Sequence, residues 1–562
     1  MLLALFLLAF PAVSPRGAVA AAHPLAAEAG ASVMRRGGNA VDAAVAAAFA
    51  LAVVEPQSSG LGGGGFALLY TAKDRKVHVL DFREVGPQAA RPDMYVQAGQ
   101  PRQDLANAGP LSVAVPAAVK GYAELAKRFG KRPLSQLTSP AEQIALRGFQ
   151  VNVAFVHAAE GRLDCLAADP EAARIFLRRD GDEWAALQPG DKLIQPDLSR
   201  TLHAIGERGA DAFYKGRIAR SIVESLASRG GIVTMDDLLR VQVRERQPLE
   251  STYRGYRIVT MPLPSSGGFV VSALLNVLER EDPHAGGYRP ERFLHAMIET
   301  EKRLFALRQS IGDPSFNPGV EERVRRMVTK EFAGELSNQI GDKATLAEQV
   351  IQQREHGTTS IAAVDEEGNA IALTTTVNDG FGSCIVARGA GFILNDQMDD
   401  FAVAPGVANA YGLRGDAENA PGAGKVPLSS MAPTLVFAPD GAFAFALGSS
   451  GGATIPTTVA QAIVHVVDDH MTVDRAVAQP RLHHNLFPDV VHVEPGGLEA
   501  ATAHALEARG HKLDFAKEPF QEHERSFFAT LWGKACGVQI DADTGWRMGA
   551  CDVRYDGGGA IP

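Results

Sequence analysis

Two runs of apolar and β-branched residues, at positions 358–365 and 369–376, flank a short acidic turn at 366–368 that ends in glycine. This pattern predicts a β-hairpin, because a three-residue loop with a left-handed glycine is a common connection between strands. Pairing outward from the turn places Thr358 opposite Thr376, with Cβ atoms about 5 Å apart. The two hydroxyls would then lie within hydrogen-bonding distance, although threonine pairs also occur on solvated sheets.

The remaining pattern predicts helices and strands in alternation. Helical periodicity occurs at residues 23–36, 39–54, 117–129, 140–147, 151–159, 197–207, 215–229, 290–308, 453–468 and 498–509, and strand patterns at 66–70, 77–82 and 256–261. The glycine-rich turn at 60–65 precedes a strand and lacks a following Lys-Ser or Lys-Thr, which favours close backbone packing over phosphate binding. Strands flanked by helices indicate a layered α/β sandwich, and no linker divides the chain.

Composition limits the classes of function. The 562 residues are 46% apolar and 21% charged, which is typical of a soluble globular protein with a large core. The net charge is −10 and the pI is about 5.9, and no basic block occurs, so we expect no nucleic-acid partner.

The metal-binding and redox residues are scattered. Four cysteines, at positions 165, 384, 536 and 551, form no Cys-X-X-Cys pair, so we expect neither a disulfide framework nor a zinc site. The pair His483-His484 is not part of a His-Glu-X-X-His motif, and we predict no metal.

Several further motifs occur in a fixed order along the chain. They are Gly-Gly-Asn-Ala-Val-Asp-Ala-Ala at 37–44, Gly-Leu-Gly-Gly-Gly-Gly-Phe at 60–66, Asp-Phe-Arg-Glu at 81–84, Asn-Asp-Gly-Phe-Gly at 378–382, the segment 391–401, Pro-Leu-Ser-Ser-Met-Ala-Pro-Thr at 427–434 and Gly-Ser-Ser-Gly-Gly at 448–452. Together with the hairpin, this series resembles the γ-glutamyltranspeptidase family of N-terminal nucleophile hydrolases. The resemblance covers nearly the whole chain from about Gly17, and implies a four-layer αββα sandwich that needs no cofactor.

The resemblance implies that Thr358 becomes a nucleophile through self-cleavage. A threonine hydroxyl needs a nearby base, and an N-terminal threonine carries one in its α-amino group, with a pKa of about 7.7–8.0. Attack of the Thr358 hydroxyl on the Gly357 carbonyl would release that amine and divide the chain into a large subunit, 17–357, and a small subunit, 358–562. Gly357 has no Cβ to obstruct the attack, and Thr376 would orient the hydroxyl.

The family pattern also assigns a pocket for a γ-glutamyl group. Arg83 would bind the α-carboxylate bidentately, with Ser429 and Ser430 as hydroxyl donors. The α-ammonium would meet Asp400, Asn378 and Gln397. Arg83 and Asp400 also have simpler structural interpretations: Arg83 could pair with Glu84 at the surface, and Asp400 could cap a turn.

Two more features complete the expected site. Gly451 and Gly452, before an apolar helix, would donate backbone N–H groups to the tetrahedral oxyanion. The segment 405–424 is rich in Gly, Pro, Asn and Ala, as a lid would be, and Tyr411 would gate the pocket.

The expected activity is γ-glutamyl transfer from glutathione and related compounds to water, amino acids or dipeptides. A cephalosporin (glutaryl) acylase of the same fold is an alternative, although its substrates lack the α-ammonium that Asp400 and Asn378 would bind. An unprocessed, non-catalytic binding protein is another alternative.

The N-terminus indicates export. Residues 1–10 are almost wholly apolar and match the core of a signal peptide, but are too short to span a bilayer. We expect a signal peptide at 1–16, cleaved near Ser14, and a periplasmic or secreted protein with no stable membrane span. Cleavage after Ala20 is less suitable, because residues 17–21 resemble the first strand of the family.

Overall fold

Two seven-stranded antiparallel sheets lie at the centre of the protein. The computed structural model describes residues 11–285, 287–346, 357–515, 532–552, 554 and 557–562. In order across the first sheet, the strands are β1 (Ala12–Ser14), β22 (Arg547–Cys551), β21 (Ala535–Ile540), β17 (Phe443–Ser449), β16 (Thr434–Phe437), β13 (Tyr256–Thr260) and β12 (Leu249–Tyr253). The second contains β11 (Arg244–Arg246), β4 (Lys76–Phe82), β3 (Gly64–Thr71), β15 (Ala370–Asn378), β14 (Gly357–Asp365), β2 (Gly17–Ala21) and β23 (Gly558–Ala560).

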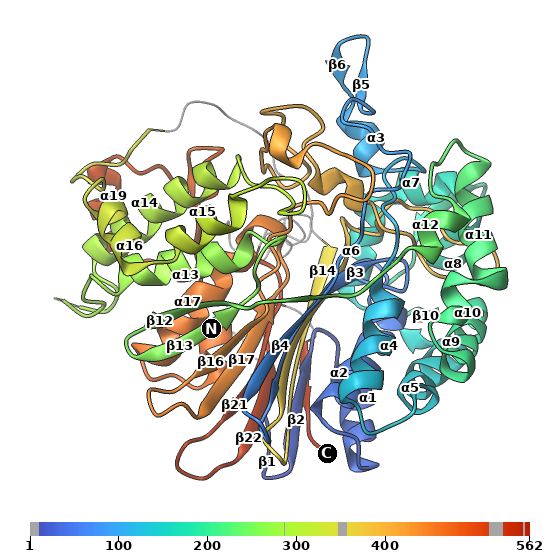
Figure 1. Cartoon of the computed structure of the whole chain (residues 1–562), viewed down its shortest axis with the longest axis horizontal. Coiled ribbons are helices and arrows are strands. Elements are labelled where there is room, and N and C mark those ends of the chain that lie inside the picture. The colour runs from blue at the N-terminus through green and yellow to red at the C-terminus, as the bar shows by residue number, and fades with distance from the viewer. Residues whose placement is uncertain (1–10, 286, 347–356, 516–531, 553, 555–556) are drawn as a thin grey trace.

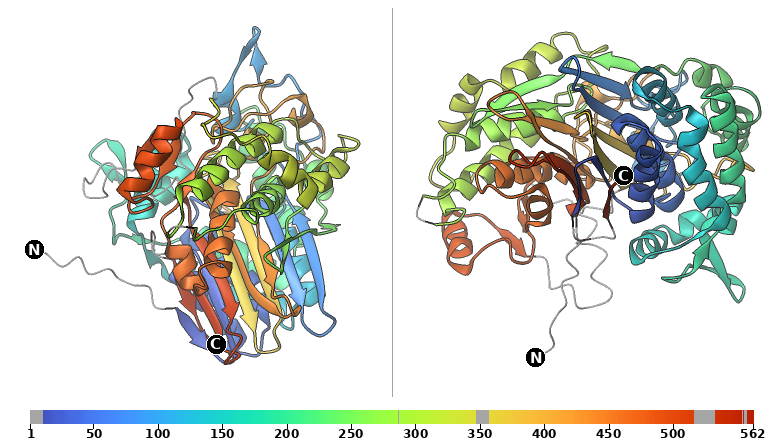
Figure 2. Two further views of the ribbon diagram at one scale, coloured as in Figure 1. Left: turned by 90° about the vertical axis from the view of Figure 1, so that its left-hand side faces the viewer. Right: turned by 90° about the horizontal axis from the view of Figure 1, so that it is seen from below.

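Helices cover both outer faces. The second sheet carries a layer that includes α1 (Pro24–Arg35), α2 (Ala40–Val54), α4 (Ala118–Phe129) and α5 (Leu134–Arg147). The first sheet is covered by α13 (Gly267–Leu278), α17 (Ile455–Val467) and α18 (Val473–Ala478). The sheets pack against each other through strands such as β14 and β17 (Figures 1 and 2). The expected four-layer αββα sandwich is therefore confirmed.

The other elements extend these layers. The helices are α3 (Gln103–Asn107), α6 (Val153–Gly161), α7 (Leu163–Ala168), α8 (Pro170–Phe176), α9 (Pro196–Arg208), α10 (Asp211–Tyr214), α11 (Gly216–Ala227), α12 (Met235–Leu239), α14 (Glu291–Arg308), α15 (Val320–Met327), α16 (Lys330–Ser337) and α19 (Ala500–Arg509). The short strands are β5 (Val96–Gln97), β6 (Gln100–Pro101), β7 (Phe149–Gln150), β8 (Leu177–Asp180), β9 (Glu183–Ala186), β10 (Lys192–Leu193), β18 (Leu482–His483), β19 (Val491–Val493) and β20 (Leu513–Phe515). In the described residues, no helix combines the length and apolarity that crossing a membrane requires.

Most predicted helices lie within two residues of the observed bounds, but α5 begins well before the predicted residue 140. The prediction treated Pro140 as a helix start, whereas it lies inside α5 and the preceding turn buries Leu137 and Thr138. Helix α2 is buried along its whole length, as its apolar sequence predicts, and a capping box between Asn39 and Asp42 begins it.

The predicted hairpin is confirmed with its register. The backbone N–H of Asp365 donates to the Asn369 carbonyl at 3.0 Å, and Thr359 pairs with Thr375, so Thr358 lies next to Thr376. Only the start of β14 departs from regular pairing, since Gly357 pairs with Asn378. The hairpin lies between β3 and β2 of the second sheet.

The glycine-rich turn packs against this hairpin. A Cβ on Gly63 would lie 1.9 Å from the carbonyl oxygen of Thr376, and one on Gly62 would lie 2.1 Å from that of Ile393. Only glycine permits these contacts, so the turn packs closely as expected.

The cysteine prediction was wrong, because the structure contains two disulfides. Cys165 is bonded to Cys384, and Cys536 is bonded to Cys551. Sequence spacing could not show this: the first pair is 219 residues apart, and the second lies directly opposite in adjacent strands β21 and β22.

The N-terminal segment joins both sheets. Residues 1–10 of the expected signal peptide lie outside the described part of the chain. Strand β2 is fully buried, and β1 pairs with β22 at a sheet edge. A boundary at residue 16 would keep β2 whole and remove β1.

Candidate active site

The hydroxyls of Thr358 and Thr376 meet at the end of the hairpin. Their Oγ1 atoms are 3.0 Å apart, and both donate to the carbonyl oxygen of Gly357, at 2.6 and 2.8 Å respectively. The Thr376 oxygen accepts a hydrogen bond of 2.8 Å from the backbone N–H of Asn378. The carbonyl before Thr358 is therefore polarised by a hydroxyl whose own orientation is fixed.

The position of Gly357 allows no side chain. A Cβ there would lie 2.7 Å from the carbonyl oxygens of both Asp379 and Gln57. This close packing holds the Gly357–Thr358 peptide between the hairpin and the loop that follows it.

Thr359, the neighbouring hydroxyl, points to the other face of the strand. It donates to the Glu55 carboxylate at 3.1 Å, and Glu55 forms a buried ion pair with Lys534. Strand alternation therefore separates Thr359 from Thr376, as expected.

A buried ion pair lies across the pocket from the threonines. Arg83 directly follows β4, is only 1% exposed, and forms a short ion pair with Asp400 at the end of the 3₁₀ turn Gln397–Asp400. Glu84 lies 3.5 Å from the other Arg83 Nη atom and is also buried, so the alternative of a surface pair is wrong. Burial raises the pKa of Glu84 to about 7, against the attraction of Arg83.

An amide and hydroxyl network joins Asp400 to the hairpin. Gln397 donates to Asp400 at 2.7 Å and to the side-chain oxygen of Asn378 at 3.1 Å. The Tyr411 hydroxyl donates to that same oxygen at 2.7 Å, and Asn409 donates to Asp400 at 3.3 Å. Residues from three separate segments therefore form one polar surface.

Some polar atoms on this surface have no hydrogen-bond partner among the described residues. They are Nε and Nη1 of Arg83 and Oε1 of Gln397, and all three are buried. Buried polar groups are normally paired, because leaving one unpaired costs about 1–3 kcal/mol. Donors of a cation that form no hydrogen bond within the described part of the chain, Nη1 having only its ion pair with Glu84, lie beside a free acceptor and a carboxylate. This arrangement suits a ligand that has both a carboxylate and an ammonium group.

Further buried carboxyl groups lie near Asp400, and their surroundings make them hold their protons more readily than usual. Burial, then the charge of Asp400, raises the pKa of Asp399 to about 8, and burial beside Asp379 raises that of Asp396. Burial also raises the pKa of Asp400, while Arg83 and Arg308 oppose this by attraction. Because burial penalises the ionised carboxylates, a cationic ligand group beside them would stabilise their charged form.

Ser429 and Ser430 lie on a loop that Arg308 helps to position. The backbone N–H and hydroxyl of Ser266 donate to the Ser429 carbonyl at 2.8 and 2.7 Å, and Nε of Arg308 donates to the Ser266 oxygen at 3.0 Å. Arg308, Glu84 and Asn409 also contact groups of the site, although none of them was among the predicted site residues. Only the position of Glu84 beside Arg83 could have identified one of them.

Gly451 and Gly452 have left-handed backbones, with φ of 117° and 56°. They precede α17 through a 3₁₀ turn, Gly452–Thr454, rather than opening the helix directly. A Cβ on Gly452 would lie 2.6 Å from the Tyr411 ring, so glycine lets that ring cover the turn.

Most of the expected residues line one pocket. Its lining comprises Arg83, Thr358, Thr376, Asn378, Gln397, Asp400, Tyr411, Ser429, Ser430, Met431, Gly452 and Ile455. Gly451 is the one predicted oxyanion donor outside this lining. A nucleophile candidate and a site for a zwitterionic group therefore share a single cavity.

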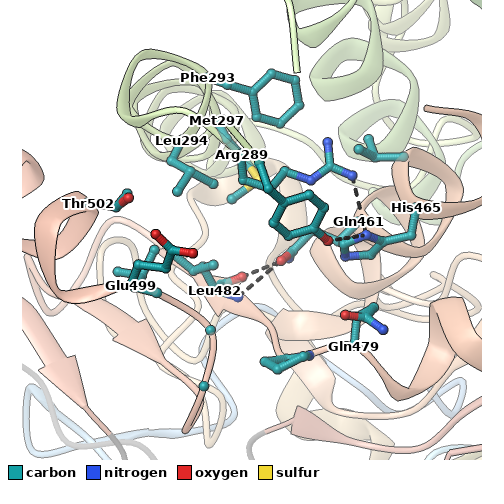
Figure 3. A pocket seen from close by; sticks show the side chains of 16 residues that line it. Arg289, Phe293, Leu294, Met297, Gln461, His465, Gln479, Leu482, Glu499 and Thr502 are labelled. Carbon is teal, nitrogen blue, oxygen red and sulfur yellow. Dashed lines mark hydrogen bonds between the residues drawn. The ribbon is translucent and has the colours of Figure 1, made fainter. Parts of the chain in front are cut away.

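A second pocket lies elsewhere, between α14, α17 and the segment before α19 (Figure 3). Two of its polar side chains bond to the protein: Gln461 exchanges hydrogen bonds with the backbone of Leu482 at 2.8 and 3.0 Å, and Arg289 pairs with Asp469. We assign the chemistry to the first pocket because it contains Thr358.

The sequence profile described as Gamma-glutamyltranspeptidase matches residues 26–561. The glutathione hydrolase proenzyme of Escherichia coli (strain K12) is 37% identical over 511 residues, covering 90% of this chain and 87% of that protein. The acylase ACY 1 proenzyme of Pseudomonas sp. (strain V22) is 35% identical, with 98% and 95% of the two chains covered.

Among solved structures, the cephalosporin acylase from Bacillus halodurans superimposes with a TM-score of 0.83 at 26% identity, covering 98% of this chain and 97% of that one. This likeness extends over both sheets and their helical layers. The profile match, together with the identity to the glutathione hydrolase proenzyme, shows that this chain belongs to the γ-glutamyltranspeptidase family.

Proposed function

We propose that this protein is a γ-glutamyltransferase and glutathione hydrolase with Thr358 as its nucleophile. The observation that carries the proposal is the shared pocket, in which Thr358 lies with the Arg83–Asp400 pair. The donor would be glutathione or a related γ-glutamyl compound, and the acceptor water, an amino acid or a dipeptide.

The enzyme forms by self-processing. The Thr358 hydroxyl attacks the Gly357 carbonyl carbon, the C–N bond breaks, and water hydrolyses the resulting ester. This leaves a carboxylate on Gly357 and an α-amine on Thr358. Donation from Thr376 to the Gly357 oxygen at 2.8 Å supports this step, because negative charge develops on that oxygen. The products are a large subunit ending at 357 and a small subunit, 358–562, which remain paired as a heterodimer.

Substrate recognition uses both charges of the glutamyl group. The α-carboxylate binds Arg83, whose Nε and Nη1 form no hydrogen bond to the described residues, with hydroxyl donation from Ser429 and Ser430. The α-ammonium binds Asp400 and the Oε1 atom of Gln397. Charge-assisted hydrogen bonds of this kind contribute about 1.5–3 kcal/mol each.

Asn378 supports ammonium binding, either directly or through Gln397. Its side-chain oxygen accepts from both Gln397 and Tyr411, so it connects the ammonium site to the lid.

Turnover then proceeds through an acyl-enzyme. The free α-amine of Thr358 takes the proton from its own hydroxyl, which attacks the γ-carbonyl while Thr376 orients it. Backbone N–H groups of Gly451 and Gly452 stabilise the oxyanion. The C–N bond of the substrate then breaks, and its amine leaves with the proton that the Thr358 α-amine had taken. Water or an acceptor amine then attacks the γ-glutamyl ester and releases Thr358.

Tyr411 closes the pocket as a gate. Its ring covers Gly452, and its hydroxyl is bonded to Asn378, so opening the 405–424 segment would expose the glutamyl site.

Export fits the two disulfides, because disulfides persist mainly in oxidising compartments. A signal peptide at residues 1–16 would direct the proenzyme to the periplasm or the medium.

The second candidate is glutaryl acylase activity, which the acylase relative and the acylase structure favour. A glutaryl group lacks the ammonium, so it would leave Asp400 beside the substrate without a cationic partner. This favours the γ-glutamyl donor.

Two measurements test the proposal. Denaturing mass spectrometry after reduction should give a chain of 205 residues that begins at Thr358. Kinetics on γ-glutamyl and glutaryl p-nitroanilides should favour the former. A persistent single chain would exclude Thr358 as the nucleophile and favour a non-catalytic binding protein. Activity on the glutaryl compound alone would show that the donor is a glutaryl compound and not a γ-glutamyl compound.

A further inference from the structure

The Cys165–Cys384 disulfide joins the two sides of the proposed cleavage point. Cys165 lies in α7, within the large-subunit sequence, and Cys384 lies six residues after β15, within the small-subunit sequence. Their Cα atoms are 5.8 Å apart. We infer that this bond becomes a covalent tether between the two subunits. It also holds the loop 379–384, which directly follows Asn378, in the position that places Asn378 at the ammonium site. The tether rests on the proposed processing at Gly357.

No other disulfide can serve as a tether. The sequence has four cysteines, all within the described residues, and none is free. The second disulfide, Cys536–Cys551, joins adjacent strands inside the small-subunit sequence. Once the peptide bond before Thr358 is hydrolysed, the Cys165–Cys384 bond is therefore the only disulfide that links the chains.

An exported protein can form this disulfide by oxidation of the two cysteine thiols. The two thiols lose two protons and two electrons to a disulfide-containing thiol oxidant, which is reduced to its dithiol. Peptide hydrolysis at Gly357 adds one water and leaves the S–S bond unchanged. Cys384 is 1% exposed, which limits attack on its sulfur by external thiols after the bond has formed.

The tether is one of several contacts between the loop and large-subunit helices. Arg162, beside α7, donates to the Gly382 carbonyl at 2.7 Å and pairs with Asp379 at 3.4 Å. The Phe381 ring packs against Phe155 and Phe176, with centroid distances of 5.5 and 5.2 Å. A salt bridge, an aromatic cluster and a disulfide thus hold a loop of only six residues.

This loop contacts the site in two places. Asn378 immediately precedes it and bonds to Gln397 and Tyr411. The carbonyl oxygen of Asp379 is also one of the two that would lie 2.7 Å from a Cβ at Gly357. Displacement of the loop would therefore move Asn378 relative to the ammonium site, without moving the nucleophile along β14.

The test compares purified protein with and without reductant under denaturing conditions. We expect one species of the combined subunit mass without reductant and two chains with it. Peptide mapping of the non-reduced sample should recover a cross-linked peptide containing Cys165 and Cys384.

The other outcomes separate two failures. Two chains in both samples would overturn the tether and leave the proposed processing intact. One chain in both samples would refute the processing, and with it a tether between subunits.

A double variant, Cys165→Ala/Cys384→Ala, tests the positioning role, with Cys536→Ala/Cys551→Ala as the matched control. We expect the first variant to process, to separate into two chains without reductant, and to raise KM for γ-glutamyl p-nitroanilide about threefold or more with a smaller change in kcat. This donor carries no thiol and leaves disulfides intact. The control should keep the tether and the KM. An unchanged KM in the first variant, or an equal rise in both, would overturn the positioning role.

Discussion

Replacement of Thr376 by valine removes one hydroxyl and nearly preserves the shape of the side chain. In the unprocessed chain this hydroxyl donates to the Gly357 carbonyl at 2.8 Å, and valine would leave that oxygen with the Thr358 hydroxyl alone. Since the attack places negative charge on the same oxygen, the variant should self-process more slowly.

The magnitude depends on how much this hydrogen bond strengthens in the transition state. A neutral bond contributes about 0.5–1.5 kcal/mol and a bond to a charged group about 1.5–3, so the difference alone predicts a rate loss of roughly tenfold. Removing an oxyanion donor from a water-excluded site costs about 10²–10³-fold, and Thr376 is only 2% exposed. We therefore expect processing to slow by about 10- to 1000-fold.

The assay follows the newly synthesised chain over time by denaturing mass spectrometry under reducing conditions. Thr376→Ser keeps the hydroxyl and should process within a few-fold of the parent. Valine also leaves the Asn378 N–H without its acceptor, so thermal unfolding must show that the variant is folded. A folded Thr376→Val protein that processes as fast as the serine variant would refute the reasoning.

Three other changes test separate parts of the site. Gly357→Ala should abolish processing, because its Cβ would lie 2.7 Å from two carbonyl oxygens, whereas Gly380→Ala, with 3.8 Å to its nearest neighbour, should process normally in the same assay. Asp400→Asn should lower kcat/KM for γ-glutamyl p-nitroanilide by about 10- to 150-fold and leave that for the glutaryl compound unchanged; equal losses would contradict an ammonium role. Glu84 has a raised folded-state pKa of about 7, so the unfolded chain loses this proton first and stability falls by roughly 3 kcal/mol between about pH 4.5 and 7. Glu84→Gln should reduce the difference in thermal unfolding between pH 5 and pH 8, and an unchanged difference would exclude this group as its source.

Local patterns predicted the β14–β15 hairpin correctly because its geometry is set within about twenty residues. Strand alternation and the turn fix which threonine faces which, and this also explains why Thr359 points toward Glu55. The irregular pairing at Gly357 could not be predicted. It depends on the carbonyls of Asp379 and Gln57, which other parts of the fold bring close.

The sequence pattern could not predict charge interactions between residues that are far apart in the chain. Arg308 ends an ordinary amphipathic helix, and nothing near it in sequence indicates that it lies close enough to Asp400 to affect its pKa. The disulfides were missed for the same reason. Cys165 and Cys384 are 219 residues apart, and Cys536 and Cys551 meet only because β21 and β22 pair, so sequence spacing does not show either contact.

The two sheets explain how the proposed cleavage before Thr358, in a central strand, would leave the fold whole. In the second sheet, the small-subunit hairpin β14–β15 lies between β3 and β2 of the large subunit. In the first, strand β16 of the small subunit pairs with β13 of the large subunit. Separating the subunits would break backbone ladders in both sheets and expose the core between them, so cleavage should free the amine of Thr358 without loosening the groups that bind the substrate. The disulfide would then add little to association under native conditions. Its value would lie in the 379–384 loop, where the chain leaves the sheet. There isolated backbone hydrogen bonds, such as that from Phe381 N–H to the Gln57 carbonyl at 3.1 Å, join it to the large subunit in place of a ladder.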